Sequence, residues 1–415
     1  MPGRAWTALA IGLLLLSVPL RHGLLFALAL VLLLTALVSL LWSRRCLDGV
    51  EYRRRLGQRR AFFGEEVELV VEIVNRKLLP LAWLEAEDEL PSDLAPENAP
   101  LVGTHNRGRG RLVNLLSLRP YERVRRHYRL VCRARGEHVL GPLRLRSGDP
   151  FGFHTAEVVS TEPDYLLVYP RVLPLERLGL PSRDPFGELR TRSWLFEDPL
   201  RIVGARDYTP SDSPRRIHWP ATARAGRLQV KLYQPTTSHR LVVVLNLNTV
   251  GPDWWAQGYD PDLLELAITT AASLAAWAAE RGYQVGLSAN GSLRRLGGQV
   301  RIPPGRDPDQ LGRVLEALAR SLPFASRSLG VLLREEARAL PYGSTLVVVT
   351  SRLDENALAE LRVLGAAGNR VVLLLIGERA PDAAPRGVRV LRVAPAASWR
   401  DLDALAPSLS ASGRP

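Results

Sequence analysis

The residues best suited to chemistry gather in one stretch near the middle of the chain, between Gly204 and Leu228. The polar and aromatic members of this central cluster are Arg206, Tyr208, Asp212, Arg216, His218, Trp219 and Arg224. Asp212 and His218 are residue types that transfer protons, while the arginines could bind anions and the aromatic rings could serve as flat apolar anchors. A hydrolase that works through Asp212 and His218 is one interpretation. A buried network of ion pairs that joins two domains is the other.

The set of residues that catalysis requires is incomplete in this cluster. No recognisable pairing with a nucleophilic Ser or Cys, with a second carboxylate or with metal-ligand spacing accompanies Asp212 and His218. The two cysteines, Cys46 and Cys132, lie far apart and form no Cys-x-x-Cys pair that could bind a metal or carry redox chemistry. We therefore expect the cluster to have a structural or interaction role, and we expect that the protein is not an enzyme.

The net charge of the chain is +13, from 55 Lys and Arg against 42 Asp and Glu, and it first suggests a nucleic-acid partner. Only Lys77 and Lys231 are lysines, however, and such an excess of arginine beside 33 Gly and 31 Pro is typical of a GC-rich genome. No binding module accompanies the arginines, so we expect no nucleic acid. Twelve arginines between residues 107 and 146 instead predict a basic face, either solvated or a docking surface for an acidic partner.

Two apolar runs without charged side chains open the chain, at residues 5–20 and 23–42. The second run has the roughly 20 residues that a helix needs to cross a bilayer, and the first is somewhat shorter. A cleaved signal peptide fits less well, because the apolar character resumes directly after Arg21 and His22. Seven arginines follow between residues 44 and 60, which predicts that the rest of the chain lies in the cytoplasm and that some of them contact anionic lipid.

Alternation of apolar and polar residues marks the next part of the chain, up to about residue 169. The clearest strands are expected at 66–75, 81–90, 111–118 and 122–134. Clusters of Gly, Pro and Asn separate them at short intervals, which predicts an antiparallel β-sandwich or a small barrel. The sequence Asp-Pro-Phe-Gly occurs twice, at 149–152 and 184–187, and predicts a tight turn that buries its Phe in the core.

From about Leu241 the pattern changes to short apolar runs that alternate with helical stretches. Strands are expected at 241–247, 284–289, 345–351, 370–377 and 388–393, and helices at 261–281, 309–322, 356–368 and 399–405. An alternation of this kind predicts a mostly parallel sheet covered by helices on both faces. Ligands of such sheets bind at the carboxyl ends of the strands, so the loop after Leu245 is the first place to look for chemistry.

The central cluster resembles the signature of a family called domain of unknown function 58, which reads approximately R-x-Y-x-x-G-D-x-x-R-x-I-H-W-x-x-x-A-R. The segments 135–154 and 168–175 are also similar to the family's lead-in, and the resemblance extends over roughly residues 1–400. Two positions depart from the family pattern. Ser211 replaces a Gly that would allow a close backbone approach to a ligand, and Pro220 replaces a frequent Lys and so removes one charge.

The resemblance implies that the C-terminal domain has a fold similar to the von Willebrand factor A domain, a Rossmann-like α/β fold with a divalent-metal site. That site uses D-x-S-x-S after the first strand and a later Asp to bind the metal through oxygen ligands. The corresponding positions here are Asn246, Asn248 and Val250, and Asp354 would be the late acidic ligand. An amide has no charge and valine has no ligand atom, so we expect a degenerate site without Mg²⁺ or any other cofactor.

The resemblance also implies partners, because such proteins commonly accompany MoxR-type AAA+ ATPases and transglutaminase-like membrane proteins in bacteria. We therefore expect a scaffold or adaptor that takes part in assembly or chaperone-like work, with the partner hydrolysing the nucleotide. It would be anchored in the bacterial cytoplasmic membrane by two spans, with its soluble domains in the cytoplasm. The alternatives are a hydrolase that uses Asp212 and His218, and a metal-dependent adhesion module.

These patterns and the resemblance together divide the chain into five segments. They are a two-helix transmembrane hairpin at 1–45, an all-β sandwich-like domain at 46–180, a connector with the central cluster at 181–238, a von Willebrand A-like α/β domain at 239–407 and a disordered tail at 408–415.

Overall fold

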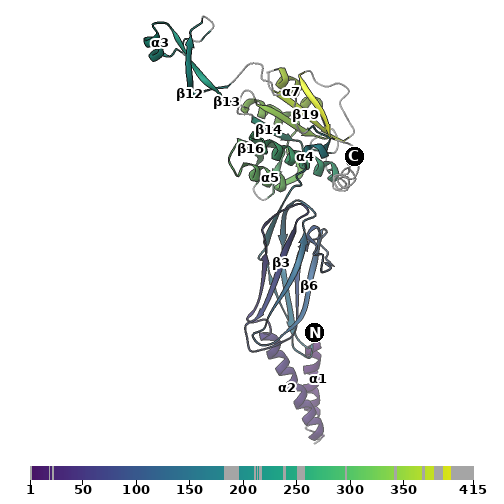
Figure 1. Cartoon of the computed structure of the whole chain (residues 1–415). Helices are drawn as coiled ribbons and strands as arrows, with labels where there is room; N and C mark the ends of the chain where they lie inside the picture. Colours follow the sequence, from purple (N-terminus) through teal and green to yellow (C-terminus); the bar gives the residue numbers. More distant parts are fainter. Residues whose placement is uncertain are drawn as a thin grey trace, which may run out of the picture. The chain divides into compact units, whose positions relative to one another are not determined.

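The computed structural model describes residues 2–17, 19–20, 23–181, 196–209, 212, 214, 217–236, 240–249, 258–294, 297–340, 344–366, 370–377 and 387–393. The chain divides into two compact units, residues 1–171 and 172–415. The first holds two helices and a set of mainly antiparallel strands, and the second holds a mainly parallel sheet with its helices (Figure 1). The helix expected at 399–405, the tail at 408–415 and the second Asp-Pro-Phe-Gly lie outside the described residues.

Two apolar helices begin the first unit, α1 (Pro2–Ser17) and α2 (Gly23–Arg45), and they lie side by side (Figure 1). By length and composition α2 could cross a membrane, and only 17% of its apolar window is buried by protein. Its last residues join the strands that follow, because Trp42 packs against their core and Cys46 is fully buried within it. The end of α2 and the β domain are therefore built as one unit.

The rest of the first unit is a β domain of three sheets, with strand orders β1-β3-β7, β10-β9-β4-β6-β5 and β2-β11-β8. Its elements are β1 (Val50–Leu56), β2 (Arg60–Phe62), β3 (Glu66–Asn75), β4 (Leu81–Pro91), the 3-10 turn η1 (Ser92–Leu94), β5 (Val102–Gly103), β6 (Arg109–Leu118), β7 (Arg123–Val131), β8 (Gly136–Leu140), β9 (Leu143–Gly148), β10 (Thr155–Ser160) and β11 (Asp164–Tyr169). Among the described strands of this β domain, only β2 and β11 pair in parallel, and the other pairs are antiparallel. The strands expected at β3, β4, β6 and β7 are confirmed.

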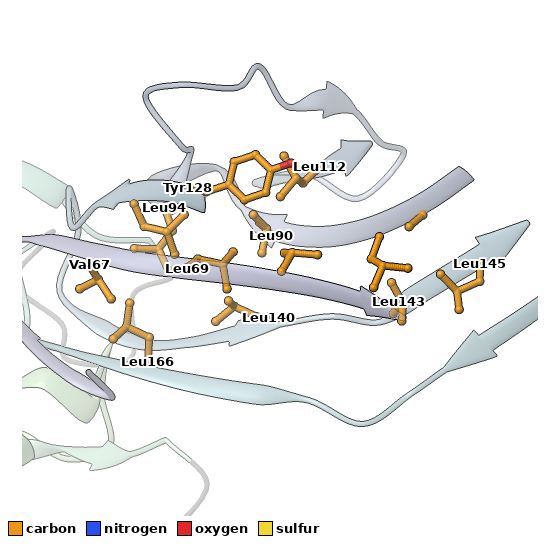
Figure 2. Close-up of a cluster of buried hydrophobic side chains, with 14 of the residues drawn as sticks. Val67, Leu69, Leu90, Leu94, Leu112, Tyr128, Leu140, Leu143, Leu145 and Leu166 are labelled. Atoms are coloured by element: carbon orange, nitrogen blue, oxygen red, sulfur yellow. The ribbon is translucent and has the colours of Figure 1, made fainter. Parts of the chain in front are cut away.

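The three sheets share one hydrophobic core, part of which Figure 2 shows. Leu69 of β3, Leu90 of β4, Leu112 of β6, Leu140 of β8 and Leu166 of β11 belong to it and are fully buried. Burying a leucine side chain completely contributes about 1.5–3 kcal/mol relative to leaving it in water. The period-two pattern of the sequence follows from this arrangement, because one side of each strand faces the core and the other faces water.

The first Asp-Pro-Phe-Gly forms the expected turn but does not bury its Phe. The Asp149 carboxylate accepts backbone N–H bonds from Phe151 (3.0 Å), Phe153 (3.3 Å) and His154 (2.6 Å), and Asp149 itself is buried. The Phe151 side chain is 58% exposed. The prediction of a buried Phe at this turn is therefore wrong for Phe151, because the carboxylate cap satisfies the loop backbone and leaves the ring outside.

The second unit is built on a seven-stranded sheet of order β16-β15-β14-β18-β19-β20, with β17 paired to β15. Its elements are β14 (Arg240–Leu245), α4 (Pro261–Glu280), β15 (Gln284–Leu293), β16 (Gln299–Gly305), α5 (Gln310–Arg320), β17 (Ser321–Ala325), α6 (Leu329–Ala339), β18 (Thr345–Thr350), α7 (Glu355–Ala366), β19 (Arg370–Ile376) and β20 (Val388–Val393). The strands β14, β15, β18, β19 and β20 run parallel, as the alternation of strands and helices predicts, whereas β16 and β17 are antiparallel.

Helix α4 is the most deeply buried helix described in this unit. Asp260 caps its first turn by accepting the backbone N–H groups of Asp262 and Leu263, and Gly282 follows its end with a φ of 73°. Its length and composition would also suit a membrane span, but 78% of its apolar window is buried inside the unit. Burial by protein identifies α4 as a core helix.

The second unit also contains a separate hairpin that the sequence pattern did not predict. Strands β12 (Phe196–Asp207) and β13 (Gln229–Thr236) pair antiparallel in a sheet of their own, and α3 (Trp219–Ala225) lies between them in the chain. The short turn η2 (Leu175–Leu178) precedes them. Pro199 in β12 and Pro235 in β13 obscured these strands, because proline within a run argues against a strand.

Candidate functional site

The central cluster lies on the β12–β13 hairpin and on α3. Arg206 is in β12, His218 is the N-cap of α3, Trp219 is its first residue and Arg224 is in its last turn. Arg216 lies outside the described residues. The structure thus gathers the described members of the cluster on one small substructure, and it gives each of them a different task.

Arg206 and Asp212 form a two-pronged ion pair, with Nη1–Oδ2 and Nη2–Oδ1 distances of 2.7 and 2.5 Å. Thr209 adds its backbone N–H at 2.9 Å and its hydroxyl at 2.7 Å to Oδ2. The Arg206 hydrogen bond, followed by those of Thr209, holds the pKa of Asp212 well below its usual range. Asp212 is therefore a carboxylate across the neutral range and a poor proton donor. Arg206 is exposed, so this pair differs from the buried network that the sequence suggested.

His218 has a backbone role at the start of α3. Its N–H donates to the Gln229 carbonyl at 2.7 Å, and its Nδ1 accepts the N–H of Ala221 at 3.1 Å. An accepting Nδ1 carries no proton, so the neutral ring has its proton on Nε2. Among the described residues no hydrogen bond joins His218 to Asp212. Asp212 and His218, the two candidates for proton transfer, therefore each stabilise the loop through their own hydrogen bonds.

The aromatic members of the cluster are placed differently from each other. Trp219 is 66% exposed, and Leu228 and Leu232 on the same hairpin are exposed as well. Tyr208 is half-buried and donates its backbone N–H to the Leu228 carbonyl at 2.9 Å. Trp, Tyr and Arg are the residue types that most often dominate the energetics of protein interfaces. The hairpin and α3 thus expose one tryptophan and two leucine side chains on a substructure that its own hydrogen bonds define.

The carboxyl end of β14 is the second region to which the sequence points. Asn246 is buried, and its Nδ2 donates to Thr350 Oγ1 at 2.9 Å and to the Arg352 carbonyl at 3.3 Å. Its Oδ1 accepts Nδ2 of Asn290 at 2.7 Å and the backbone N–H of Asn248 at 3.1 Å. Hydrogen bonds therefore occupy both polar atoms of the Asn246 side chain, at the position where the sequence predicts a degenerate site.

Asp354 and Asn290 complete this region in ways that the sequence did not indicate. Asp354 accepts the N–H of Ala357 at 2.6 Å and so caps α7. Asn290 is fully buried on β15, one residue beyond the strand end that the apolar run predicted, and its Oδ1 accepts the N–H of Leu247 at 2.8 Å. Among the described residues, no group of three or more His, Cys, Asp or Glu is placed to hold a metal ion.

We expect Asn246→Asp to lower the free energy of unfolding by about 1–3 kcal/mol, because a buried carboxylate oxygen would then face the Arg352 carbonyl without a hydrogen to donate. Mg²⁺ should not restore the loss, since the neighbouring ligands are amides. Urea unfolding with and without Mg²⁺ measures both effects, and Asn248→Asp, at a less buried position, is the control. Stabilisation of Asn246→Asp by Mg²⁺, together with calorimetric binding of Mg²⁺ to the unmodified protein, would contradict this prediction.

At least six of the twelve arginines between residues 107 and 146 form ion pairs with acids in the fold. The pairs are Arg109–Glu89, Arg111–Glu87, Arg146–Glu85, Arg144–Glu157, and Arg123 and Arg125 with Glu72. Most of these acids lie on β3 and β4, outside the arginine-rich segment of the sequence. Strand pairing brings these arginines and acids together, so at least half of the arginines in this segment have an acidic partner within the domain.

The Uncharacterized protein YeaD of Bacillus subtilis (strain 168) is 23% identical over 332 residues, which are 79% of this chain and 75% of that protein. The sporulation control protein Spo0M of Bacillus subtilis aligns with a TM-score of 0.20 and 12% identity, over 32% of this chain and 53% of its own. A cohesin module of a Clostridium perfringens family 33 glycoside hydrolase aligns with a TM-score of 0.20 and 13% identity, over 29% of this chain and 96% of its own.

The family match is narrower than the resemblance expected over residues 1–400. It begins near the end of β12 and ends with β20, so it includes the central cluster, the seven-stranded sheet and the helices α4 to α7. Residues 204–393 of this chain match the family described as Protein of unknown function DUF58.

Proposed function

We propose that this protein is a membrane-anchored scaffold that binds other proteins through the β12–β13 hairpin and α3. The observation that carries the proposal is the exposed Trp219 ring on a helix whose cap and preceding loop are held by internal hydrogen bonds. An exposed Trp on an ordered substructure suits a binding surface, because Trp is among the residue types that most often dominate the energetics of protein interfaces. The ion pair and the helix cap keep this surface in shape, and the Trp219 ring would make the contact.

The membrane anchor in this proposal consists of two spans, α1 and α2. The 20 apolar residues from Gly23 to Trp42 give α2 a span of about 30 Å, which matches the hydrocarbon thickness of a bilayer. With 16 residues α1 is about 24 Å long and would need local thinning of the bilayer. The seven arginines between 44 and 60 favour a cytoplasmic location for everything after α2, since the positive-inside rule counts charges near the ends of a span.

A fold similar to the von Willebrand factor A domain is part of the same proposal. Parallel strands with β14 between β15 and β18, and α4 following β14, support it. In this interpretation the amide cluster around Asn246 and Asn290 replaces the metal site, so partner binding would not depend on a cation.

We infer the partners from the resemblance of the central cluster. A MoxR-type AAA+ ATPase would supply nucleotide hydrolysis, and a transglutaminase-like membrane protein would be a neighbour in the same membrane. The scaffold would then hold the ATPase at the cytoplasmic surface for assembly or chaperone-like work. The hydrolase alternative has less support, because Asp212 is bound to Arg206 and its pKa is lowered, whereas a general acid needs a raised pKa.

We expect Trp219→Ala to remove most of the ATPase that is recovered with the protein from solubilised membranes. The substitution acts on an exposed side chain, so it should change the free energy of unfolding by less than about 0.5 kcal/mol. His218→Asn is the matched control on the adjacent residue, because an Asn side chain also caps a helix while the imidazole is lost. Co-purification in each nucleotide state, followed by mass spectrometry, measures the outcome.

The two variants also separate the scaffold from the enzyme. A scaffold predicts that His218→Asn keeps both the partner and the cellular activity. An enzyme predicts that His218→Asn keeps the partner but loses the activity. If no ATPase is recovered with the unmodified protein in any nucleotide state, the proposed partnership is wrong.

A further inference from the structure

Three loops of the β domain lie at the end where α2 enters it, and each exposes a large apolar side chain. We call them the entry loops, residues 76–80, 119–122 and 149–154. The strand register defines their position, because β1 starts at Val50 directly after α2 and pairs there with Asn75 at the end of β3. The first unit is compact, so these loops and α2 can be considered together.

The loop 149–154 is in direct contact with both helices. His154 Nδ1 and Ser39 Oγ of α2 are 2.9 Å apart, and the Phe153 ring lies 5.6 Å from the ring of Trp6 in α1. Phe151, whose ring is 6.0 Å from that of Phe153, is 58% exposed beside them. Ser39 itself is fully buried at this contact.

The loop 76–80 is tied to the residues just after α2. Lys77 Nζ donates to the carbonyl oxygens of Cys46 and Asp48, the latter at 2.6 Å. Its neighbour Leu78 is 74% exposed. This loop therefore lies against the end of α2 with its apolar tip in water.

The loop 119–122 is tied in turn to the loop 76–80. The buried Asn75 donates its side-chain amide to the carbonyl oxygens of Leu79 and Arg119, each at 3.0 Å, and Tyr121 donates its N–H to the Lys77 carbonyl. Tyr121 has a positive φ of 57°, which is uncommon for an aromatic residue, and its side chain is 67% exposed. Hydrogen bonds thus set the two loops side by side. The side chains of Tyr121 and Leu78 both remain exposed to solvent.

The expected depth of these loops relative to the membrane follows from the position of Ser39 in α2. The apolar run of α2 ends at Trp42, and Ser39 comes three residues earlier, which is about 4.5 Å along a helix axis. A loop that packs on Ser39 therefore reaches past the end of the apolar run toward the hydrocarbon. Aromatic and leucine side chains are the residues that enter the boundary between headgroups and acyl chains, to a depth of about 5–10 Å. Exposed cations at the same end, Arg44, Arg45 and Arg119, suit anionic headgroups.

We propose that the entry loops form a lipid-binding surface, in which Leu78, Tyr121 and Phe151 enter the interface of an anionic bilayer while Arg44, Arg45 and Arg119 meet headgroup phosphates. The inference rests on the proposed membrane insertion of α2 and adds a second attachment to it. The β domain would then stand on the bilayer through three loops and would not pivot on α2 alone. The exposed side chains of Leu78, Tyr121 and Phe151 would then be covered by lipid.

The test places an environment-sensitive fluorophore at Phe151→Cys in the full chain. Burial raises the pKa of both native thiols, that of Cys132 to about 11, so the introduced thiol is labelled selectively. The protein is reconstituted in vesicles of phosphatidylcholine and phosphatidylglycerol that carry a doxyl group at a shallow or a deep acyl position. We expect the Phe151→Cys label to shift its emission to the blue and to be quenched more by the shallow doxyl than by the deep one. Labels at Leu78→Cys and Tyr121→Cys should show the same blue shift and the same stronger quenching by the shallow doxyl.

Two further labels separate this inference from the proposed anchor. Leu34→Cys in the middle of α2 should be quenched by the deep doxyl. Phe62→Cys lies on β2, beyond the end of β1 that is opposite α2, and its label should not be quenched at all. If Leu34→Cys is quenched and Phe151→Cys is not, the β domain does not enter the lipid and this inference is overturned while the anchor stands. If neither is quenched, the membrane anchor itself is wrong. Equal quenching at Phe62→Cys and Phe151→Cys would also overturn the inference, because contact would not be specific to the entry loops.

Discussion

Arg54→Met is expected to lower the free energy of unfolding of the β domain by about 3–5 kcal/mol, because it leaves a buried carboxylate without a countercharge. The Arg54 side chain is 6% exposed and that of Asp88 is fully buried, with Nε and Oδ2 2.7 Å apart. Tyr52 donates its hydroxyl to the same oxygen at 2.9 Å, and Arg54 also reaches Asp164 Oδ2 at 3.2 Å. The second oxygen of Asp88 has no hydrogen-bond partner in the described part of the chain, so Arg54 is its main compensation.

The effect of Arg54→Met should depend on pH with a definite sign. Burial raises the pKa of Asp88 in the folded protein, and the loss of Arg54 removes the main opposing influence. The folded state of the variant then binds the proton more tightly than the unfolded state does. Its deficit in stability should therefore be constant above the raised pKa of Asp88, shrink as the pH falls through that pKa, and level off below the pKa of an unfolded aspartate.

Two controls make this prediction specific. Arg55→Met removes the next arginine, which is exposed and pairs with Glu72 at 3.3 Å, and should cost less than about 1 kcal/mol. The double variant Arg54→Met with Asp88→Leu should recover most of the loss, since two apolar side chains replace the buried pair. Urea unfolding of the full chain in detergent, with hydrogen exchange at the β-domain amides, measures all three. An unchanged unfolding free energy for Arg54→Met would show that the pair is not needed.

Leu34→Arg should prevent stable insertion of α2, because an arginine near the middle of a span costs about 2.5–3.5 kcal/mol in translocon-mediated insertion. Leu34 lies close to the midpoint of the apolar run and is 51% exposed on the helix surface. The variant should move from the carbonate-resistant membrane fraction to the soluble or aggregated fraction.

The matched control for the membrane experiment is Leu115→Arg. Leu115 is a comparably exposed leucine on β6 of the β domain, where water surrounds it. This variant should remain in the membrane fraction at the level of the unmodified protein. If Leu34→Arg also remains there, α2 is not a membrane span, and neither the anchor nor the lipid surface proposed for the entry loops holds.

Elements with a strong periodic pattern could be predicted from the sequence, and elements without one could not. The run at β3 and the helix α4 were expected within a residue or so of their ends, because an unbroken apolar pattern with a cap or a turn at each end leaves little choice. Helix α6 and the hairpin of β12 and β13 were missed. Helix α6 has only 11 residues, so its helical pattern is short, and the hairpin strands contain Pro199 and Pro235.

The candidate site shows the same division. The sequence indicated the central cluster by residue type and spacing, but the roles of Asp212 and His218 depend on Arg206, Thr209 and a helix start that only the folded chain brings to them. Asn290 could not be found, because its partner Asn246 is 44 residues away and follows the end of the neighbouring strand β14.

The sequence by itself determined that the chain begins with apolar runs long enough for membrane helices, continues with strands of period two and ends with alternating strands and helices. It also determined the excess of arginine, since charge is a sum over residues. Only the tertiary structure decided where that charge acts. Arg54 is buried beside Asp88, the arginines of β6 and β7 pair with acids from β3 and β4, and Arg44 and Arg45 stay exposed at the end of α2. Strand pairing joins residues that are distant in the chain, and a charge is neutralised by what lies near it in space.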